Sequence, residues 1–205
     1  MTAAASGQLS RSDEDQTVVP RIRRARPQDA VEVALETFTS GARLDMQTLA
    51  AQLDVSPATL HRWFGLRAQL LDRVCEHLAE EFGSAALAQA QGDGDERVCD
   101  YARRVITAGL AFEPVRVFVS REPQLAMRLL LGKGGGVHRV VTEQMRAIIA
   151  VTRTAAQAQR LQESVDLIAQ VATSLVWTTF IIGEDPQVED AVKIVRMILA
   201  SSRAR

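Results

Sequence analysis

The chain has 205 residues, with 24 Lys or Arg against 25 Asp or Glu and a formal net charge of −1. This length fits one compact domain or a small domain joined to a larger one, and a hydrophobic content of 47% excludes wholesale disorder. The near-neutral charge excludes indiscriminate binding to nucleic acid but allows a local basic patch. Aromatic residues make up only 4%, and the abundance of Ala, Leu, Gln, Glu and Arg favours helix over sheet.

The cysteines and the apolar segments indicate the compartment. Cys75 and Cys99 show no motif spacing, which is typical of a chain kept in a reducing environment. No apolar run is expected to reach the ~18–20 residues of a membrane span, and the N-terminus lacks the apolar core of a signal peptide. We therefore expect a cytoplasmic protein with no membrane partner.

The N-terminal segment divides into two parts. Residues 1–19 are polar and aperiodic, which predicts a disordered leader. A basic run follows and contains four arginines: Arg21, Arg23, Arg24 and Arg26. The run is either a solvated linker or a basic arm that enters a narrow minor groove of DNA. We favour the arm because the run adjoins the helical motif described next.

Three helices are expected early in the chain, from Pro27 up to Gly41, at 46–53 and at 57–64. Pro27 suits a first helical position, and Gly41 suits a left-handed helix stop. Asp45 and Ser56 directly precede the two short helices and are suitable N-caps. A supporting helix followed by two short helices and tight turns is the layout of a helix-turn-helix.

The rest of the chain is also predicted to be helical. A fourth helix begins near residues 66–68 and either ends by Gly83 or frays through the Ala-rich stretch that follows. Residues 91–95 form a linker and residues 132–136 a glycine-rich loop. Further helices are expected at 96–112, 123–131, 137–159, 162–182 and 186–201, and a short helical or irregular piece at 115–121. Without strand alternation or an internal repeat, the predicted fold class is all-α.

The segment from Met46 to Phe64 resembles the helix-turn-helix of the TetR family of bacterial regulators. The matching positions are Leu49-Ala50, Val55-Ser56, Thr59-Leu60 and Phe64, with Arg67 in the basic position that follows. The chain departs from the family pattern at Met46, Asp54, His61 and Trp63. Asp54 replaces a turn glycine and tolerates a left-handed conformation better than most residues do.

The resemblance implies a set of DNA contacts. Phosphates would be bound by Thr59, His61, Trp63 and Arg67, and bases or sugars would face Gln47, Pro57, Ala58 and Arg62. The Arg62 guanidinium can bond guanine O6 and N7 together, and the Gln47 amide can pair with adenine. The alternative roles are a plain surface residue for His61 and a core aromatic for Trp63.

The distribution of charge agrees with this assignment. Residues 20–73 carry +2, whereas residues 1–19 carry −2 and residues 74–205 about −1. The sequence thus predicts a leader at 1–19, a DNA-binding domain at 20–73 and a helical effector-binding and dimerisation domain at 74–205.

A helix-turn-helix of this size needs a partner to span two half-sites, roughly 34–36 Å apart on DNA. The helical segments 162–182 and 186–201 are apolar over more than one face. These faces either fill the domain's own core or form a two-fold homodimer interface. We favour the interface, which the family resemblance also implies.

An effector site is expected between the helices of the larger domain. The candidate ligand-binding residues are Tyr101, Phe118, Arg121, Met127, Arg128, Trp177, Thr178 and Phe180. Trp177 is the foremost candidate because its large ring carries one hydrogen-bond donor. Parts of 120–149 and 174–199 are similar to QsdR-type regulators of the same family, which implies a small apolar or lactone-like effector.

Catalytic patterns are missing from the sequence. Lys133 in the glycine-rich run has no Ser or Thr after it and no strand before it, so the run is not a phosphate-binding loop. The three histidines are far apart, so no zinc site is predicted. We predict no enzyme activity, cofactor or metal, but a homodimeric, ligand-responsive repressor that binds double-stranded operator DNA. The alternative is a helical ligand sensor that acts through a protein partner, or an activator.

Overall fold

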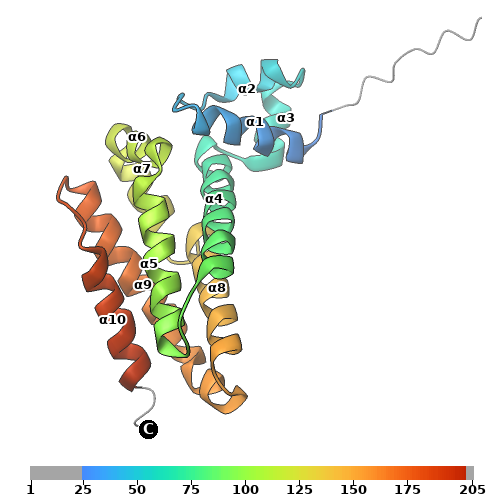
Figure 1. Ribbon diagram of the computed structural model, residues 1–205. Helices are drawn as coiled ribbons and strands as arrows, with labels where there is room; N and C mark the ends of the chain where they lie inside the picture. The colour runs from blue at the N-terminus through green and yellow to red at the C-terminus, as the bar shows by residue number, and fades with distance from the viewer. Residues whose placement is uncertain (1–24, 202–205) are drawn as a thin grey trace, which may run out of the picture.

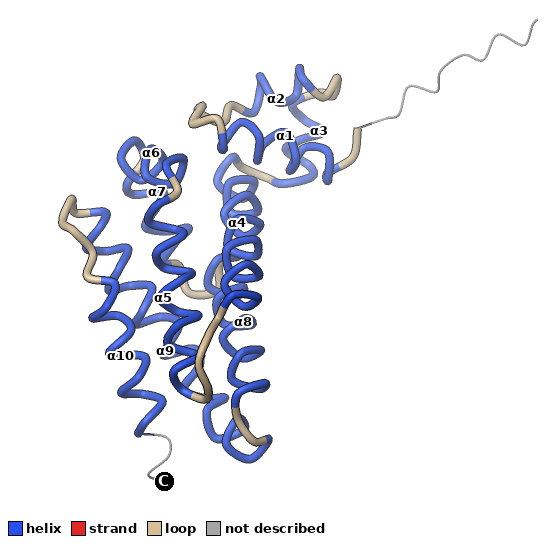
Figure 2. Tube along the Cα trace, viewed as in Figure 1, coloured by secondary structure: helices blue, strands red, loops and turns tan. Residues whose placement is uncertain are grey.

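The computed structural model describes residues 25–201, apart from the side chains of Gln162 and Glu163. The expected leader at 1–19 and three arginines of the basic arm, Arg21, Arg23 and Arg24, lie outside the described residues. Within the described part there are ten helices and no strand, which confirms the all-α prediction (Figures 1 and 2).

Three short helices, the N-terminal cluster α1–α3, lie at one end of a bundle formed by the longer helices (Figure 1). The long helix α4 connects the two parts, because it packs against α1 and α3 at its beginning and against α5 and α8 further on. The helices are α1 (Pro27–Thr39), α2 (Met46–Gln52), α3 (Pro57–Phe64), α4 (Arg67–Gln89), α5 (Asp95–Ala111), α6 (Glu113–Arg121), α7 (Pro123–Leu131), α8 (Gly136–Thr152), α9 (Ala155–Ile181) and α10 (Val188–Ser201).

Side-chain caps begin the two short helices of the cluster. The Asp45 carboxylate accepts hydrogen bonds from the backbone amides of Gln47 and Thr48 at 3.1 and 2.8 Å. The Ser56 hydroxyl accepts one from the amide of Thr59 at 3.1 Å. These bonds satisfy amides that have no partner within their own helix. Both predicted N-caps are therefore confirmed.

The helix α4 continues through Gly83, which the sequence left as a possible end. Gly83 is buried, and a Cβ atom there would overlap the side chain of Gln144 on α8. The Gln144 amide donates to the carbonyls of Ala79 and Glu80 at 3.4 and 3.3 Å and accepts from the Tyr101 hydroxyl at 2.9 Å. Gly83 thus permits a close approach of two helices rather than a helix stop.

The boundary between α8 and α9 lies earlier than predicted. The sequence indicated helices at 137–159 and 162–182, but α8 ends at Thr152 and α9 begins at Ala155. The Thr154 hydroxyl accepts from the Gln157 amide at 3.4 Å, and the Gln157 side chain accepts from the Thr154 amide at 3.2 Å. This reciprocal pair is a capping box, and the apolar periodicity on both sides concealed it.

Buried apolar side chains join the N-terminal cluster to the bundle. One core includes Leu49 and Leu60 of the cluster, Leu70 of α4 and Phe118 of α6. Phe38 of α1 meets Phe118 edge to face, with ring centroids 5.5 Å apart. A second core unites parts of α4, α5, α8, α9 and α10. The cluster is thus packed against α4 and α6 rather than tethered by a linker.

The helix α9 contains one stretch, Ser164–Ile181, that is long and apolar enough to cross a membrane by length and composition alone. No apolar run of this length was expected from the sequence, and the stretch in α9 corrects that expectation. Its mean hydropathy is 1.3, and α9 packs against α7, α8 and α10. A core helix of a helical bundle meets the same criterion, so the stretch is weak support for a membrane span.

Candidate functional site

The helix α3 is anchored on one face and free on the other. Leu60 is fully buried, with 0% of its surface exposed. The residues predicted to face bases or sugars are exposed, as is one predicted phosphate ligand: Gln47, Pro57, Ala58, Arg62 and His61. This arrangement leaves the outer face of α3 and the start of α2 available to a partner.

The turn before α3 has the conformation that its sequence predicts. Asp54 has a φ of 51° and is the one non-glycine residue with positive φ in the described part of the chain. The backbone amide of Val55 donates to the carbonyl of Ala50 at 3.0 Å and closes the end of α2. Aspartate accepts this left-handed geometry at lower cost than most side chains do.

Two of the predicted phosphate ligands also have structural contacts. The Thr59 hydroxyl lies 2.9 Å from the Ser56 hydroxyl. Trp63 is half-buried against the apolar core and meets Phe64 edge to face at 6.4 Å. The ring of Trp63 therefore fills part of the junction of α3 with α1 and α4, in line with its alternative role as a core aromatic.

Arg67, the first residue of α4, bonds within the protein. Its Nη1 and Nη2 atoms donate to the two carboxylate oxygens of Glu122 at 2.7 and 2.6 Å. Its Nε atom donates to the carbonyl of Leu44 at 2.6 Å. Three of its five N–H donors are thus engaged. The structure therefore directs Arg67 toward the α6–α7 corner, and a phosphate contact by it is not favoured.

The Arg67–Glu122 pair is the centre of what we term the corner contact. Arg43 lies 3.8 Å from the same carboxylate, and Arg121 donates to the carbonyl of Gly41 at 2.7 Å. Hydrogen bonds from Arg67, followed by the charges of Arg67 and Arg43, hold the pKa of Glu122 below its usual range. The α1–α2 loop and the start of α4 are thus bound to the α6–α7 corner.

Arg26 is the one arginine of the predicted basic arm within the described residues. Its side chain is 62% exposed and lies 3.7 Å from Asp29. Its backbone amide donates to the Asp29 carboxylate at 2.7 Å. Arg26 therefore precedes α1 with its guanidinium accessible.

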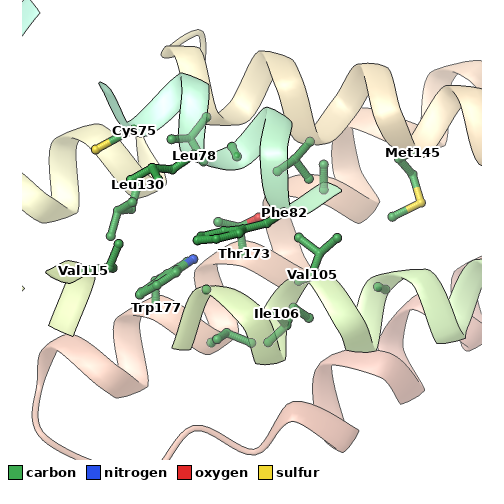
Figure 3. Close-up of a pocket in the computed structure, with 18 of the residues that line it drawn as sticks. Cys75, Leu78, Phe82, Val105, Ile106, Val115, Leu130, Met145, Thr173 and Trp177 are labelled. Carbon is green, nitrogen blue, oxygen red and sulfur yellow. The ribbon is translucent and has the colours of Figure 1, made fainter. Parts of the chain in front are cut away.

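An apolar cavity lies inside the bundle. It is bounded by α4, α5, α8 and α9, with one residue each from α6 and α7, and its free volume is about 90 Å³ (Figure 3). Its lining includes Cys75, Phe82, Tyr101, Gly109, Thr173 and Trp177.

The cavity is uncharged. Among the described residues that line it, none is Asp, Glu, Lys, Arg or His. Burial, with a smaller effect of Asp72, raises the pKa of the Cys75 thiol to about 12, and burial raises the pKa of the Tyr101 phenol as well. Both groups are therefore neutral at physiological pH.

Two of the eight predicted ligand-binding residues, Tyr101 and Trp177, line this cavity. The other six do not line it, and their role in ligand binding stays a prediction: Phe118, Arg121, Met127, Arg128, Thr178 and Phe180. Met127, Arg128 and Thr178 are exposed. Phe118 packs on Phe38, and Phe180 lies under the Arg116 guanidinium at 5.4 Å.

Several important residues were not singled out from the sequence. Thr173 is four residues before Trp177 on α9, a spacing that places both on one helix face. Phe82 opposes them from α4 (Figure 3). Glu122 is 55 positions from Arg67, so no local pattern connects them. Only the Thr173–Trp177 spacing was available as a signal.

The outward surface of α9 and α10 exposes large apolar side chains. Leu167, Leu175 and Met197 are 55%, 37% and 70% exposed, and Ile182 directly after α9 is 63% exposed. Part of the apolar surface of α10 is buried within the chain itself, at Ala191, Val192, Val195 and Leu199, and so belongs to the domain's own core. The four exposed residues define what we term the α9–α10 face.

No group of three or more His, Cys, Asp or Glu side chains that could hold a metal ion is found among the described residues.

Comparisons with known proteins match this architecture. A family model described as "Tetracyclin repressor-like, C-terminal domain" matches residues 93–200, more than half of the chain. The chain is similar in structure to the transcriptional repressor QsdR of R. erythropolis, from the TetR family, with a TM-score of 0.77 and 24% identity over 85% of this chain and 94% of that chain.

It is also similar to the TetR family repressor AlkX of a Dietzia strain, which is implicated in biodegradation of n-alkanes. The TM-score is 0.58 and the identity 18%, over 87% of this chain and 94% of that chain. At these identities the two structures show the fold. No match was found among curated protein sequences.

Proposed function

The chain belongs to the TetR family of transcriptional regulators, and on this premise we propose that it is a homodimeric repressor whose operator binding is controlled by a small apolar effector. Regulators of this family are not enzymes, which agrees with the prediction of no catalysis. The observation that carries the proposal is the combination of an exposed α3 and an interior apolar cavity in one packed chain.

DNA recognition is assigned to the exposed face of α3 and the start of α2. Arg62 is exposed near the end of α3, and its guanidinium can bond guanine O6 and N7 in the major groove. Gln47, Pro57 and Ala58 would meet bases or sugars, whereas Thr59, His61 and Trp63 would meet the backbone. Arg26 and the arginines before it would supply charge to the adjacent minor groove.

Dimerisation is assigned to the α9–α10 face. Contiguous exposed apolar surface marks protein interfaces, and these four exposed side chains all lie on or directly after the last two helices of the described chain. A two-fold axis through this face would place two copies of α3 on one side of DNA, as half-sites one helical turn apart require. The occupant we propose for the face is therefore a second copy of this chain.

Effector control is assigned to the cavity and the corner contact. Val115 of α6 and Leu130 of α7 line the cavity, and Glu122 lies between these two helices. A ligand that displaces α6 or α7 would also displace Glu122 and, through Arg67, the start of α4. The spacing of the two α3 helices would change, and an effector that prefers the altered conformer would release DNA.

Selection from a random DNA pool tests this function. The full chain is expected to enrich a two-fold symmetric sequence with half-sites about 10 base pairs apart. The same selection with Arg62→Ala is expected to give a sequence with a relaxed position in each half-site. Recovery of no enriched sequence by the wild-type chain would contradict the proposal, and enrichment of an asymmetric single site would contradict its dimeric form.

A further inference from the structure

The cavity offers an ionic ligand nothing to bind. Its described lining includes no cation that could pair with a carboxylate or phosphate and no anion that could pair with an amine. Placing an unpaired charge in an apolar interior is strongly unfavourable. The lining therefore selects against every ligand that is ionised at neutral pH.

The polar groups that remain in the lining are few. The Tyr101 hydroxyl is already used, since it donates to Gln144 at 2.9 Å. The Trp177 indole nitrogen and the Thr173 hydroxyl form no hydrogen bond with any group in the part of the chain that the structure describes. Figure 3 shows the Trp177 nitrogen directed into the space near Thr173 and Phe82.

Both of these groups can donate a hydrogen bond. An indole N–H is a donor only, and a threonine hydroxyl can donate as well as accept. A donor left without an acceptor in an apolar site costs free energy that a ligand acceptor restores. The pair is therefore matched by a carbonyl or ether oxygen, and an aliphatic body would fill the rest of the cavity.

The position of the indole ring is fixed by its neighbours. A Cβ atom at Gly109 of α5 would lie 3.2 Å from Cζ2 of Trp177, so the ring depends on the absence of a side chain there. Phe180 meets the ring edge to face, with ring centroids 5.9 Å apart. A donor held in this way is preorganised for its acceptor.

We propose that the cavity binds an uncharged, largely aliphatic molecule with one hydrogen-bond acceptor, such as an alkyl ester, ketone or lactone, and rejects the corresponding carboxylate. The acceptor is bonded by Trp177 Nε1 and the Thr173 hydroxyl. This inference rests on the proposed function, in which the cavity is the effector site.

Three probes of similar length test the ligand class on the full-length protein by calorimetry and thermal shift. They are methyl decanoate, decanoate and n-decane at pH 7.5. Methyl decanoate is expected to bind and to raise the melting temperature, n-decane to bind about 10-fold more weakly, and decanoate at least 10-fold more weakly. Decanoate binding as tight as that of the ester, or no binding of any probe, would overturn the proposal.

Two variants test the donor pair. Thr173→Val and Trp177→Phe are each expected to weaken methyl decanoate binding about 3- to 10-fold, the range expected for one neutral hydrogen bond, with little change for n-decane. Thr107→Val is the matched control, because Thr107 is exposed on α5 outside the cavity. Equal losses for the ester and the alkane would mean lost packing and would overturn the hydrogen-bonding role.

Failure of the proposed ligand class can be distinguished from failure of the proposed DNA-binding function. Binding of the selected DNA by the same preparation, measured without any probe, reports the DNA-binding function. Retained DNA binding with no preference for the ester over the carboxylate would refute the ligand class alone. A clear preference for the ester in a chain that selects no DNA would refute the regulator and support the cavity assignment.

Discussion

The two ends of the molecule present opposite chemistry. At the N-terminal cluster the recognition groups are exposed, polar and partly cationic, and three short helices are held by side-chain caps and a few buried residues such as Leu60. In the bundle the recognition groups are buried and uncharged, and long helices surround a cavity. The first surface suits a polyanion, whereas the second suits a neutral molecule withdrawn from water.

In the proposed function, coupling between the two ends passes through the residues that join the N-terminal cluster to the bundle. Among residues 25–201, none of those that line the cavity belongs to α1, α2 or α3. The Phe38–Phe118 ring pair and the Arg67–Glu122 ion pair connect the cluster to α6 and the α6–α7 corner, and α6 and α7 also contribute to the cavity wall. The helix α4 also connects the two ends, because it lines the cavity and packs against α3.

The largest expected effect is a loss of operator affinity when the proposed homodimer dissociates and its two N-terminal clusters separate. Leu167→Glu with Leu175→Glu places charges on the α9–α10 face, so the dimer is expected to dissociate. Because two linked half-site contacts gain about 10²–10⁴ in avidity, operator affinity is expected to fall by at least about 100-fold. Sedimentation and DNA binding measure the two effects. Val151→Glu, at an exposed residue of α8, is the control; a variant that remains dimeric would remove the α9–α10 face from the account.

The next largest effect is a loss of DNA affinity caused by a change in the N-terminal cluster alone. Arg62→Ala is expected to cost about 1–3 kcal/mol on the selected sequence, the value of one bidentate base contact, and much less on random duplex. Competition binding measures both values. Arg116→Ala, which removes a cation on α6, should leave the ratio unchanged. A loss of equal size on both DNAs would identify Arg62 as a phosphate ligand instead.

Breaking the corner contact is expected to have a smaller effect on stability. Glu122→Gln leaves the Arg67 guanidinium without its ionic partner, and about 1.5–3 kcal/mol of unfolding free energy should be lost, as for hydrogen bonds between charged groups. Urea denaturation measures the difference. Glu113→Gln removes an exposed carboxylate next to Arg116 and should cost much less. Similar losses in both variants would contradict a special role for the corner contact.

The same pair predicts a pH dependence. The pKa of Glu122 is lowered in the folded chain, so its contribution is complete above the usual glutamate pKa of about 4.3. The contribution is lost as the pH falls through the lower folded value. The stability difference between wild type and Glu122→Gln should therefore shrink below about pH 4. A difference that grew on acidification would contradict the assignment.

A side chain at Gly83, where α4 and α8 approach closely, is expected to lower the free energy of unfolding by about 1–2 kcal/mol. Gly83→Ala gains about 1 kcal/mol of helix propensity but displaces Gln144, which makes three hydrogen bonds. The net result is a less stable protein. In a Gln144→Ala background the same change should become neutral or stabilising. Denaturation of the wild type, the two single variants and the double variant gives the coupling energy between positions 83 and 144. A coupling energy of zero would mean that Gly83 does not serve this contact.

The smallest effect is at the start of α9. Thr154→Ala removes the cap hydroxyl and is expected to cost about 1 kcal/mol. Thr154→Ser keeps the hydroxyl and should retain most of the stability, as measured by thermal unfolding. If Thr154→Ser lost as much stability as Thr154→Ala, the methyl group rather than the cap would be responsible.

Local signals account for what could be predicted from the sequence. Asp45, Ser56 and Asp54 act through backbone groups within three or four residues, so the cluster α1–α3 was predicted with its caps and its turn. Gly83 was ambiguous because a helix stop and a close helix approach both require glycine. Periodicity alone could not locate the break at Thr154.

The cavity and the corner contact could not be predicted because they depend on tertiary packing. The lining comes from six helices, and aromatic residues such as Phe118 and Phe180 look equally suitable in sequence. Arg67 carried the right charge for phosphate, but its partner Glu122 is 55 residues away. Which aromatic residues line the cavity depends on how the helices pack together, and no short sequence motif specifies that packing.

The most direct test of the central claim, that cavity occupancy controls DNA reading, is a single titration. Fluorescence anisotropy of the selected DNA bound to the full chain is followed as methyl decanoate is added, while calorimetry reports occupancy of the cavity. DNA is expected to be released in proportion to the occupancy of the cavity. A cavity filled to saturation while the DNA remains fully bound would contradict it.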